Sequence, residues 1–409
     1  SSDLGQVKVL WHGEMVADVP AEHLALGGGA PVYIRETKRP AYLDETRAFD
    51  PSSITDVNAD TASDVLLKIL GSPNIASKRW VFEQYDTMVR TNTVVGPGSS
   101  DAAVVRLKDS EKGLAVKTDC NSKYVYLNPR KGAQIAVAEA ARNVVCAGGK
   151  PVAITNCLNF GNPYKPEQYW VFKEAVSGMG EACRAFNTPV TGGNVSFYNE
   201  NPEGAVYPTP TIGMLGVVED VKQHATAFEF KQEGDLVLEL SPEAQPQLGI
   251  EASEYLTRIH GVTAGDAPSF TMEGEIAVQE ACLSLIRLGL VQSAHDVSDG
   301  GMAVSLAEMC LASDGLGADI NLDASNDQRL DSALFSEAQS RIILAVRPEK
   351  FEKIRQSLDG FSVQLKKLGV VVGDGLTIAV AGEPVISASS AGMHKVYENA
   401  IPDLMSKSL

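Results

Sequence analysis

The stretch AQIAVAEAARNVVCAGG at residues 133–149 is the clearest structural signal in the chain. Its apolar residues recur at helical spacing, and a Gly-Gly pair ends the pattern, which predicts a helix with one buried side. The next residues, PVAITNCLNF at 151–160, read as a buried strand, and the cycle repeats as a helix over 167–186 and a strand from residue 189. An alternation of this kind predicts an α/β, or layered α+β, fold.

The chain length predicts more than one domain, since 409 residues exceed the usual size of a single one. We expect a first α/β unit over 63–228 and a second over 229–409. Residues 7–19 read as a β-hairpin that turns at His12-Gly13, and 36–62 are polar and turn-rich, as in a linker. An isolated hairpin is marginal in water. We therefore interpret 1–62 as the terminal hairpin of a preceding domain plus a linker, and the chain as a fragment.

Composition excludes several classes of function. The net charge of −17 opposes nonspecific binding to nucleic acid or anionic membranes, and no apolar run reaches the roughly 18 residues of a membrane span. The start, SSDLGQ, does not resemble a signal peptide, so we expect a cytoplasmic protein. The cysteines occur singly, which disfavours a zinc site or a disulfide scaffold. Four of them lie in helical, apolar stretches and are predicted to be buried thiols: Cys146, Cys183, Cys282 and Cys310.

Two aspartates stand where metal ligands often occur. GPGSSDAAVVRL at 96–107 lacks the P-loop and Rossmann signatures, yet it could place Asp101 near a metal–phosphate site. The alternative is a plain turn before a strand. In KTDCN at 117–121, Asp119 ends a strand, where magnesium ligands are common. A solvated turn aspartate is the alternative there.

The motif HDVSDGG at 295–301 resembles a loop that presents backbone amides to phosphate ahead of a helix. His295 has no evident acid–base partner in the nearby sequence, so we do not predict a catalytic role for it. Asp299 is predicted to cap the helix that follows.

The motif TGGNVSF at 191–197 is the strongest candidate for a ligand site. Its two glycines allow the backbone to approach a ligand closely. The side-chain oxygen of Asn194 can bind a hard cation, and Ser196, two residues on, faces the same side of the strand. A β-bulge built on a glycine pair is the alternative interpretation.

Several long stretches together resemble a known family. YDTMVRTNTVVGPGSSDAAVVRL, KTDCNSKYVYLNPRKGAQIAVAEAARNVVCAGGKPVAITNCLNFGNPYKPE and TPVTGGNVSFYNENPEGAVYPTPTIGMLGVVEDV are similar to the second half of phosphoribosylformylglycinamidine synthase, the small-type synthetase subunit. The piece GEMVADVPAEHLALGGGAPVY resembles the end of that family's first half. The resemblance covers nearly the whole chain and is densest over 84–220.

The resemblance implies an ATP-dependent carbon–nitrogen ligase of purine biosynthesis that uses ATP and Mg²⁺. Such an enzyme phosphorylates the amide oxygen of formylglycinamide ribonucleotide, and ammonia derived from glutamine then displaces the phosphate. The implied fold is AIR-synthetase-like: an N-terminal barrel-forming domain and a C-terminal α/β domain in each of two homologous halves. The implied partners are the missing N-terminal half, a glutaminase subunit, a small bridging subunit and the ribonucleotide substrate. We also expect the fragment to form a homodimer through the exposed barrel surface.

The resemblance also assigns roles to individual residues. Asn156 and Gly193 correspond to ATP contacts, Asn194 to a magnesium ligand and Ser196 to a substrate contact. Relatives commonly carry aspartate where this chain has Asn156, so a charge-assisted hydrogen bond is lost there. The family's catalytic histidine and most magnesium carboxylates belong to the first half, so we expect the fragment alone to be inactive.

Two other readings stay open at this point. One is a single-unit relative, such as aminoimidazole ribonucleotide synthetase or selenophosphate synthetase, although the closing hairpin of an upstream domain speaks against it. The other is a non-catalytic half that only scaffolds a partner. Magnesium-dependent nucleotide binding would separate an enzyme from a scaffold.

Overall fold

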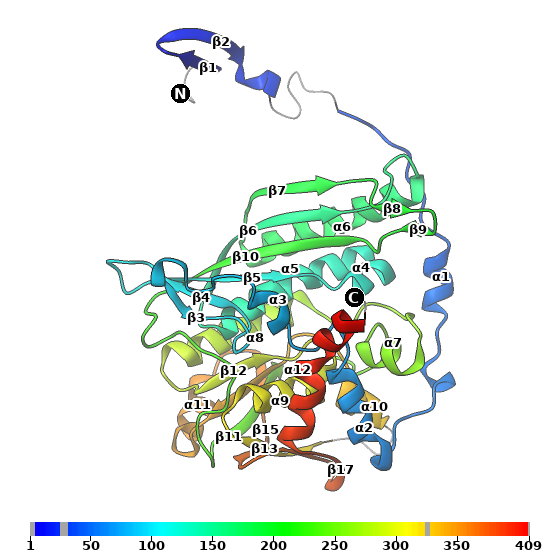
Figure 1. Cartoon of the computed structure of the whole chain (residues 1–409), viewed down its shortest axis with the longest axis vertical. Helices are drawn as coiled ribbons and strands as arrows, with labels where there is room; N and C mark the ends of the chain where they lie inside the picture. The colour runs from blue at the N-terminus through cyan, green and yellow to red at the C-terminus, as the bar shows by residue number, and fades with distance from the viewer. Residues whose placement is uncertain (1–4, 25–31, 324–327, 408–409) are drawn as a thin grey trace.

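The computed structural model describes residues 5–24, 32–323 and 328–407. The expected units 1–62 and 229–409 each include residues outside these ranges. Two large sheets organise the described chain, and Figure 1 shows them one above the other, with the hairpin β1–β2 apart from both. The hairpin consists of β1 (Gln6–Trp11) and β2 (Glu14–Pro20), which confirms the predicted turn at His12-Gly13.

The first sheet has six strands in the order β3-β4-β5-β10-β6-β7. All neighbouring pairs are antiparallel except β6 and β7, which run parallel. The strands are β3 (Thr93–Val95), β4 (Ala103–Arg106), β5 (Gly113–Asp119), β6 (Lys150–Asn159), β7 (Val190–Ser196) and β10 (Thr209–Val218), and the two-residue strands β8 (Glu200–Asn201) and β9 (Gly204–Ala205) form a small ribbon beside it. A parallel pair needs a crossover connection, and α6 provides it here.

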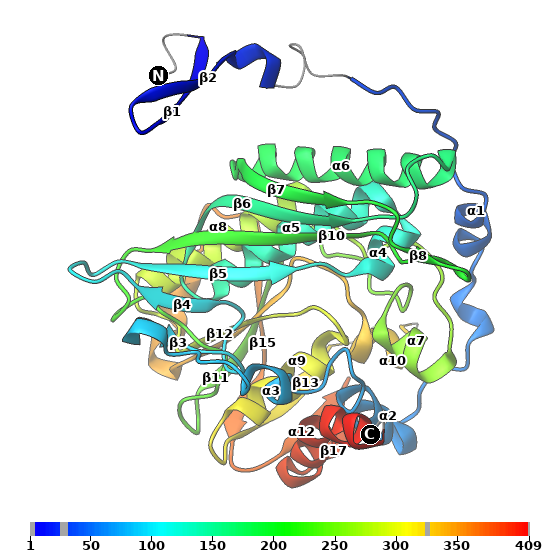
Figure 2. The same ribbon diagram turned by 45° about the horizontal axis from the view of Figure 1, so that its top comes forward.

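Helices α5 (Pro129–Cys146) and α6 (Pro166–Phe186) cover one face of this sheet. Figure 2 shows α6 lying along β7 and β6. Helix α5 begins at Asn128, whose side chain accepts from the backbone N–H of Lys131. The helix was predicted to bury one side, but it is buried on nearly all sides, because it lies between the first sheet and helix α8 (Met272–Arg287) of the second unit.

The second sheet has seven strands in the order β12-β14-β11-β15-β13-β16-β17. Strand β14 (Ile342–Val346) is buried on both faces, in keeping with its continuous apolar run. Alternate residues of β14 join two different cores, one under α8 and one under α9 (Gly301–Ala312). The other strands are β11 (Leu236–Pro242), β12 (Ser293–Asp296), β13 (Gly317–Leu322), β15 (Val363–Val372), β16 (Leu376–Val380) and β17 (Glu383–Ala388).

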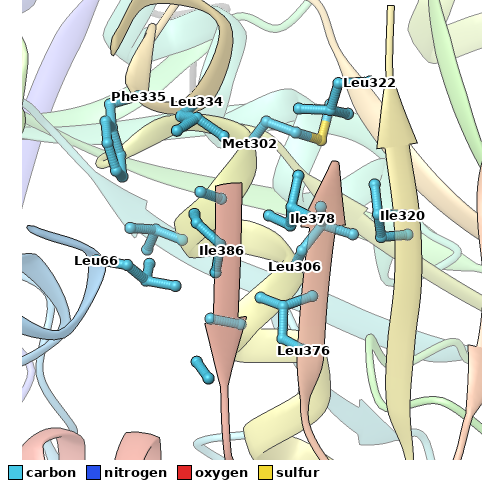
Figure 3. Packing of buried hydrophobic residues seen from close by; sticks show 14 of the residues in the cluster. Leu66, Met302, Leu306, Ile320, Leu322, Leu334, Phe335, Leu376, Ile378 and Ile386 are labelled. Carbon is cyan, nitrogen blue, oxygen red and sulfur yellow. The ribbon is translucent and has the colours of Figure 1, made fainter. Parts of the chain in front are cut away.

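The core under α9 is the larger of the two, and Figure 3 shows Leu306, Ile378 and Ile386 meeting within it. Helix α2 (Ala59–Leu70) contributes Leu66 to this core, so the packing does not follow the expected start of the first unit at residue 63. The remaining helices are α1 (Tyr42–Arg47), α3 (Arg79–Phe82), α4 (Ser122–Leu127), α7 (Glu254–His260), α10 (Leu330–Phe335), α11 (Phe351–Ser357) and α12 (Ser390–Lys407), with short 3₁₀ turns at Ala21–Leu24, Pro51–Ser53, Val89–Thr91 and Pro348–Lys350.

The polar segment 36–62, predicted to be a linker, is held against both units. Leu43 is fully buried, and Tyr42 stacks on Tyr126 with ring centroids 4.4 Å apart. The carboxylate of Asp56 accepts from the backbone N–H groups of Leu330 and Asp331 at 3.0 and 2.9 Å. This segment therefore packs as a strap along the molecule.

The four cysteines that were predicted to be buried are all buried free thiols. Within the described ranges, no helix combines the length and the apolar character that a bilayer span requires.

Candidate functional site

The parallel pair β6–β7 brings the predicted site residues together at one edge of the first sheet. In its register, Asn156 lies opposite Gly193, and Cys157 lies opposite Asn194. Asn159 lies opposite Ser196 at the ends of the two strands. Residues separated by 37 positions are thus neighbours, because α6 carries the chain back to the start of the same edge.

The strand period divides these residues between two faces. Asn156 lies two residues from the buried Ile154 and Leu158 and shares their face of the strand, so it points to the helix-covered face. Asn194 and Ser196 lie on the opposite, open face, as their spacing predicted. Cys157 joins them there, with its sulfur 3.9 Å from the Asn194 amide nitrogen.

Gly193 is required beside Asn156. A Cβ at this position would lie 2.1 Å from the side-chain oxygen of Asn156, which is a severe clash. The glycine pair does coincide with an irregularity in the β6–β7 register, near Thr155. The β-bulge interpretation therefore describes this edge, whereas close approach of the glycines to a ligand stays a prediction.

The exposed Cys157 is a neighbour of the site that motif reasoning did not select. It alternates with Asn156 in ITNCLNF, so its place on the open face could have been deduced from the strand period alone. Its thiol is exposed, unlike those of the four cysteines on helices.

A second polar assembly is buried between the two units. The Arg142 guanidinium of α5, which is fully buried, contacts both carboxylate oxygens of Glu275 at 2.8 Å. It also donates to Gln339 at 2.8 Å and to Asp296 at 3.3 Å. Burial alone would lower the pKa of Arg142, but Glu275, Asp296 and Glu139 raise it, so the group stays charged. Arg142 thus joins α5 to three elements of the second unit.

Carboxylates crowd around this arginine. The side-chain nitrogen of Asn143 donates to Asp119 at 3.3 Å and to Asp296 at 3.5 Å, which places the two acids close together. Burial raises the pKa of Asp119 to about 7 against the opposing charge of Lys117, and the negative charge of Asp296 adds to the rise. Burial and the charge of Asp101 raise the pKa of Asp296 to about 6. Each carboxylate therefore resists ionisation next to the others.

Glu139, one helical turn before Asn143, belongs to the same group. Burial raises its pKa well above the ordinary range, and the negative charge of Asp119 adds to the shift. Oxygen donors of this kind are what a hard cation such as Mg²⁺ prefers. Asp119, a candidate from sequence, is half-buried at the edge of this cluster and accepts from Asn143, so the solvated-turn alternative does not describe it.

His295 has partners that the local sequence did not reveal. Its Nδ1 lies 2.7 Å from Asp101, and its Nε2 lies 3.1 Å from Glu308 on α9. Burial would lower the pKa of His295, but these two carboxylates raise it well above its usual value. Asp101, His295 and Asp296 offer ligand atoms within 4.8 Å of one another. Because both ring nitrogens are already engaged, the histidine acts here as a charged bridge between the glycine loop and the second unit.

Two details of HDVSDGG differ from expectation. Asp299 does not cap α9, which follows Gly300 without a side-chain cap; its carboxylate accepts from Asn121 at 2.7 Å instead. The backbone N–H of Gly300 donates to Glu337 at 2.7 Å, and that of Gly301 donates to Ser298. These two glycine amides are thus engaged within the protein rather than presented to an outside phosphate.

Comparison with known proteins agrees with this architecture. Residues 99–218 match the model of the AIR synthase related protein, N-terminal domain, and residues 232–381 match that of the C-terminal domain. The chain therefore contains an N-terminal and a C-terminal domain of the AIR synthase related type. The two matched ranges correspond to the units built on the first and second sheets.

Curated relatives confirm the resemblance to phosphoribosylformylglycinamidine synthase. The chain is 58% identical over 405 residues to the synthase subunit PurL of Salinibacter ruber, covering 98% of this chain and 53% of the relative. It is 47% identical over 403 residues to PurL of Moorella thermoacetica, again covering 98% and 53%. The chain therefore spans about half the length of the curated relatives that it matches.

Solved structures share the fold. Thermotoga maritima PurL complexed with FGAR superimposes with a TM-score of 0.65 at 17% identity, over 81% of this chain and 53% of that one. The same protein complexed with AMPPCP gives a TM-score of 0.59 at 17% identity, over 86% and 53%. The PurLQS structure from Thermotoga maritima gives 0.56 at 20% identity, over 71% and 46%. At such identities these matches show the fold and nothing finer.

Proposed function

We propose that this chain is one half of an ATP-dependent synthase that converts formylglycinamide ribonucleotide and ammonia to formylglycinamidine ribonucleotide. The observation that carries the proposal is the position of Asn156 opposite Gly193 in the β6–β7 register, with Asn194 and Ser196 on one face of β7, in a chain 58% identical to a PurL subunit. Thermotoga maritima PurL, which shares the fold, has been solved in complex with FGAR and in complex with AMPPCP.

The edge can hold each reactant with a different group. Gly193 and Asn156 are the proposed ATP contacts, although Asn156 lies on the helix-covered face, across the strand from Asn194 and Ser196. Asn194 would ligate Mg²⁺ through its side-chain oxygen, and Ser196 would hydrogen-bond to the ribonucleotide. Bound Mg²⁺ would neutralise charge on the transferred phosphoryl group. One neutral amide is too few ligands for an octahedral ion, so carboxylates from elsewhere must complete the site.

The rest of the machinery belongs to partners of this chain. The catalytic histidine and the main metal carboxylates would come from the half by which the curated relatives exceed this chain. A glutaminase subunit would supply the ammonia, and a small bridging subunit would join it, in line with the PurLQS assembly known for the Thermotoga maritima relative. Such an enzyme would work in the cytoplasm, and this chain alone would not turn over.

Steady-state kinetics on single variants test the site, in an enzyme that combines this chain with the complementary half. Asn194→Ala should raise the magnesium–ATP concentration needed for turnover, because a metal ligand is lost. Ser196→Ala should lower kcat/KM for the ribonucleotide roughly tenfold, since a neutral hydrogen bond is worth about 0.5–1.5 kcal/mol. Asn201→Ala, which removes an exposed turn amide of β8, is the matched control. If both site variants keep wild-type constants, the site assignment is wrong.

We propose in addition that the buried carboxylates hold a structural Mg²⁺ between the two units. The observation that favours it is that Asp119 and Asp296 both accept from the Asn143 amide, at 3.3 and 3.5 Å, while Glu139 and Asp296 lie 3.6 and 3.3 Å from the same Arg142 nitrogen. A divalent cation would relieve their mutual repulsion. Millimolar MgCl₂ should then raise the melting temperature of the chain, and Asp119→Asn should abolish the rise. An equal rise with CaCl₂ and in the variant would indicate a nonspecific salt effect and contradict the site.

A further inference from the structure

The turn that follows β7 contains a residue whose side chain is aimed at Ser196. After Ser196 and Phe197 the chain reverses, and Asn199 comes back beneath the end of the strand. Its amide nitrogen donates to the Ser196 carbonyl oxygen at 2.7 Å and lies 3.3 Å from the Ser196 hydroxyl oxygen. Asn199 therefore contacts both the backbone and the side chain of the predicted substrate contact.

The same amide joins the two parallel strands where they end. It also donates to the carbonyl oxygen of Phe160, the residue after β6, at 3.1 Å. The backbone N–H of Asn199 donates to that same carbonyl at 3.1 Å, and the N–H of Phe160 donates to the Ser196 carbonyl at 3.0 Å. Asn199 thus fixes the position of Ser196 relative to β6, where Asn156 lies.

The turn adopts an unfavourable backbone conformation to make these contacts. Tyr198 has a φ of +62°, in the left-handed region that a bulky side chain rarely occupies. Phe197 anchors the turn on one side, since its ring packs edge-on against Phe172 with centroids 5.0 Å apart. Strain of this kind persists where surrounding contacts enforce it, and it is concentrated at functional sites. Here the contacts of Asn199 act together with the backbone N–H of Tyr198, which donates to the Gly161 carbonyl oxygen at 3.2 Å.

We propose that Asn199 is a positioning residue that orients the Ser196 hydroxyl toward the ribonucleotide substrate. The inference rests on the proposed function, because it assigns Asn199 through the role of Ser196. The Asn199 side-chain oxygen lies 3.5 Å from the same hydroxyl, so the amide can restrict its rotation from either side. Without this contact the hydroxyl would sample several rotamers, and part of its hydrogen bond to substrate would be lost.

Kinetics of Asn199→Ala, measured in the enzyme that combines this chain with the complementary half, test the proposal. We expect KM for the ribonucleotide to rise three- to tenfold, while kcat and KM for ATP change less than about twofold. The matched control is Asn201→Ala, because Asn201 also holds a turn with its side chain, accepting from the N–H groups of Glu203 and Gly204. That control should leave all three constants unchanged.

A double variant separates positioning from general damage. If Asn199 acts through Ser196, then Ser196→Ala with Asn199→Ala should be no worse than Ser196→Ala alone by more than about twofold. If the KM increase in the double variant equals the product of the two single-variant increases, the proposal is contradicted. So would a parallel loss of kcat, ATP affinity and melting temperature in Asn199→Ala, which is the signature of a merely structural role.

The outcomes also distinguish this inference from the proposed function. If Ser196→Ala raises KM and Asn199→Ala does not, the positioning role is wrong and the substrate site stands. If Ser196→Ala itself has no effect, the substrate site fails, and the role of Asn199 fails with it.

Discussion

Replacing Arg142 by methionine should destabilise the chain strongly, because the substitution leaves buried carboxylates without their cation. The guanidinium and Glu275 are both fully shielded from solvent and are joined by two contacts of 2.8 Å. Methionine fills much of the same volume but carries no charge. Removing one partner of a buried ion pair typically costs about 3–5 kcal/mol. With a urea m-value of about 3 kcal/mol per molar, the unfolding midpoint should fall by at least about 1 M.

Arg130→Met is the matched control, on the same helix with the same chemical change. Arg130 pairs with Glu181 and Glu174 at the surface, and its side chain is 48% exposed. A surface ion pair contributes about 0–1 kcal/mol, so this control should barely move the midpoint in urea, followed by circular dichroism. Adding Glu275→Leu to Arg142→Met should recover part of the loss, since the uncompensated charge is gone. Equal midpoints for the two arginine variants would refute the reasoning.

Two further outcomes follow from the buried groups and from the strap. Burial, with the charge of Asp299, raises the pKa of Glu337 from 4.5 to about 8, so the folded state binds the extra proton. The free energy of unfolding should therefore fall as pH rises from about 4.5 to 8, by up to about 1.4 kcal/mol per pH unit from this group. In urea titrations at pH 5.5, 6.5 and 7.5, Glu337→Gln should reduce this dependence of stability on pH. An unchanged pH dependence in the variant would contradict the assignment. Tyr42→Ala removes a stacked pair worth about 0.5–1.5 kcal/mol, so trypsin should cleave at Arg47 faster than in the wild type; equal cleavage rates would mean that the stack does not hold the strap.

Periodicity alone predicted the elements that carry the proposed site. The apolar pattern of 133–186 predicts the helix–strand–helix order, and α5, β6 and α6 follow it within a few residues. The strand period also placed Asn194 and Ser196 on one face. Asn156 faces away from Asn194 and Ser196. This could not be deduced from either strand alone, because it depends on the register between β6 and β7.

Contacts between distant parts of the chain could not be deduced from local sequence. Arg142 meets Glu275 across 133 positions and Gln339 across 197, and His295 meets Asp101 across 194. A motif search around His295 therefore found no partner, although the folded chain supplies two. Asp299 was predicted to cap a helix because of its position, but its carboxylate accepts a hydrogen bond from the side chain of Asn121, in the other unit, instead.

The strap shows the same limit. Its polar composition is typical of a linker, and only isolated apolar residues such as Leu43 interrupt it. Those few apolar residues hold the strap in place together with Asp56, which accepts from the first backbone N–H groups of α10. Each of them contacts a partner that lies far away in the sequence.

Reconstitution of synthase activity tests the central proposal most directly. The chain, alone or mixed with a separately produced complementary half, would be supplied with formylglycinamide ribonucleotide, ATP, Mg²⁺ and ammonia, and formation of formylglycinamidine ribonucleotide would be measured. We predict no turnover by the chain alone, turnover by the mixture, and a mixture weakened by Asn194→Ala. Turnover by the chain alone, or a mixture with wild-type activity despite the substitution, would contradict the proposal.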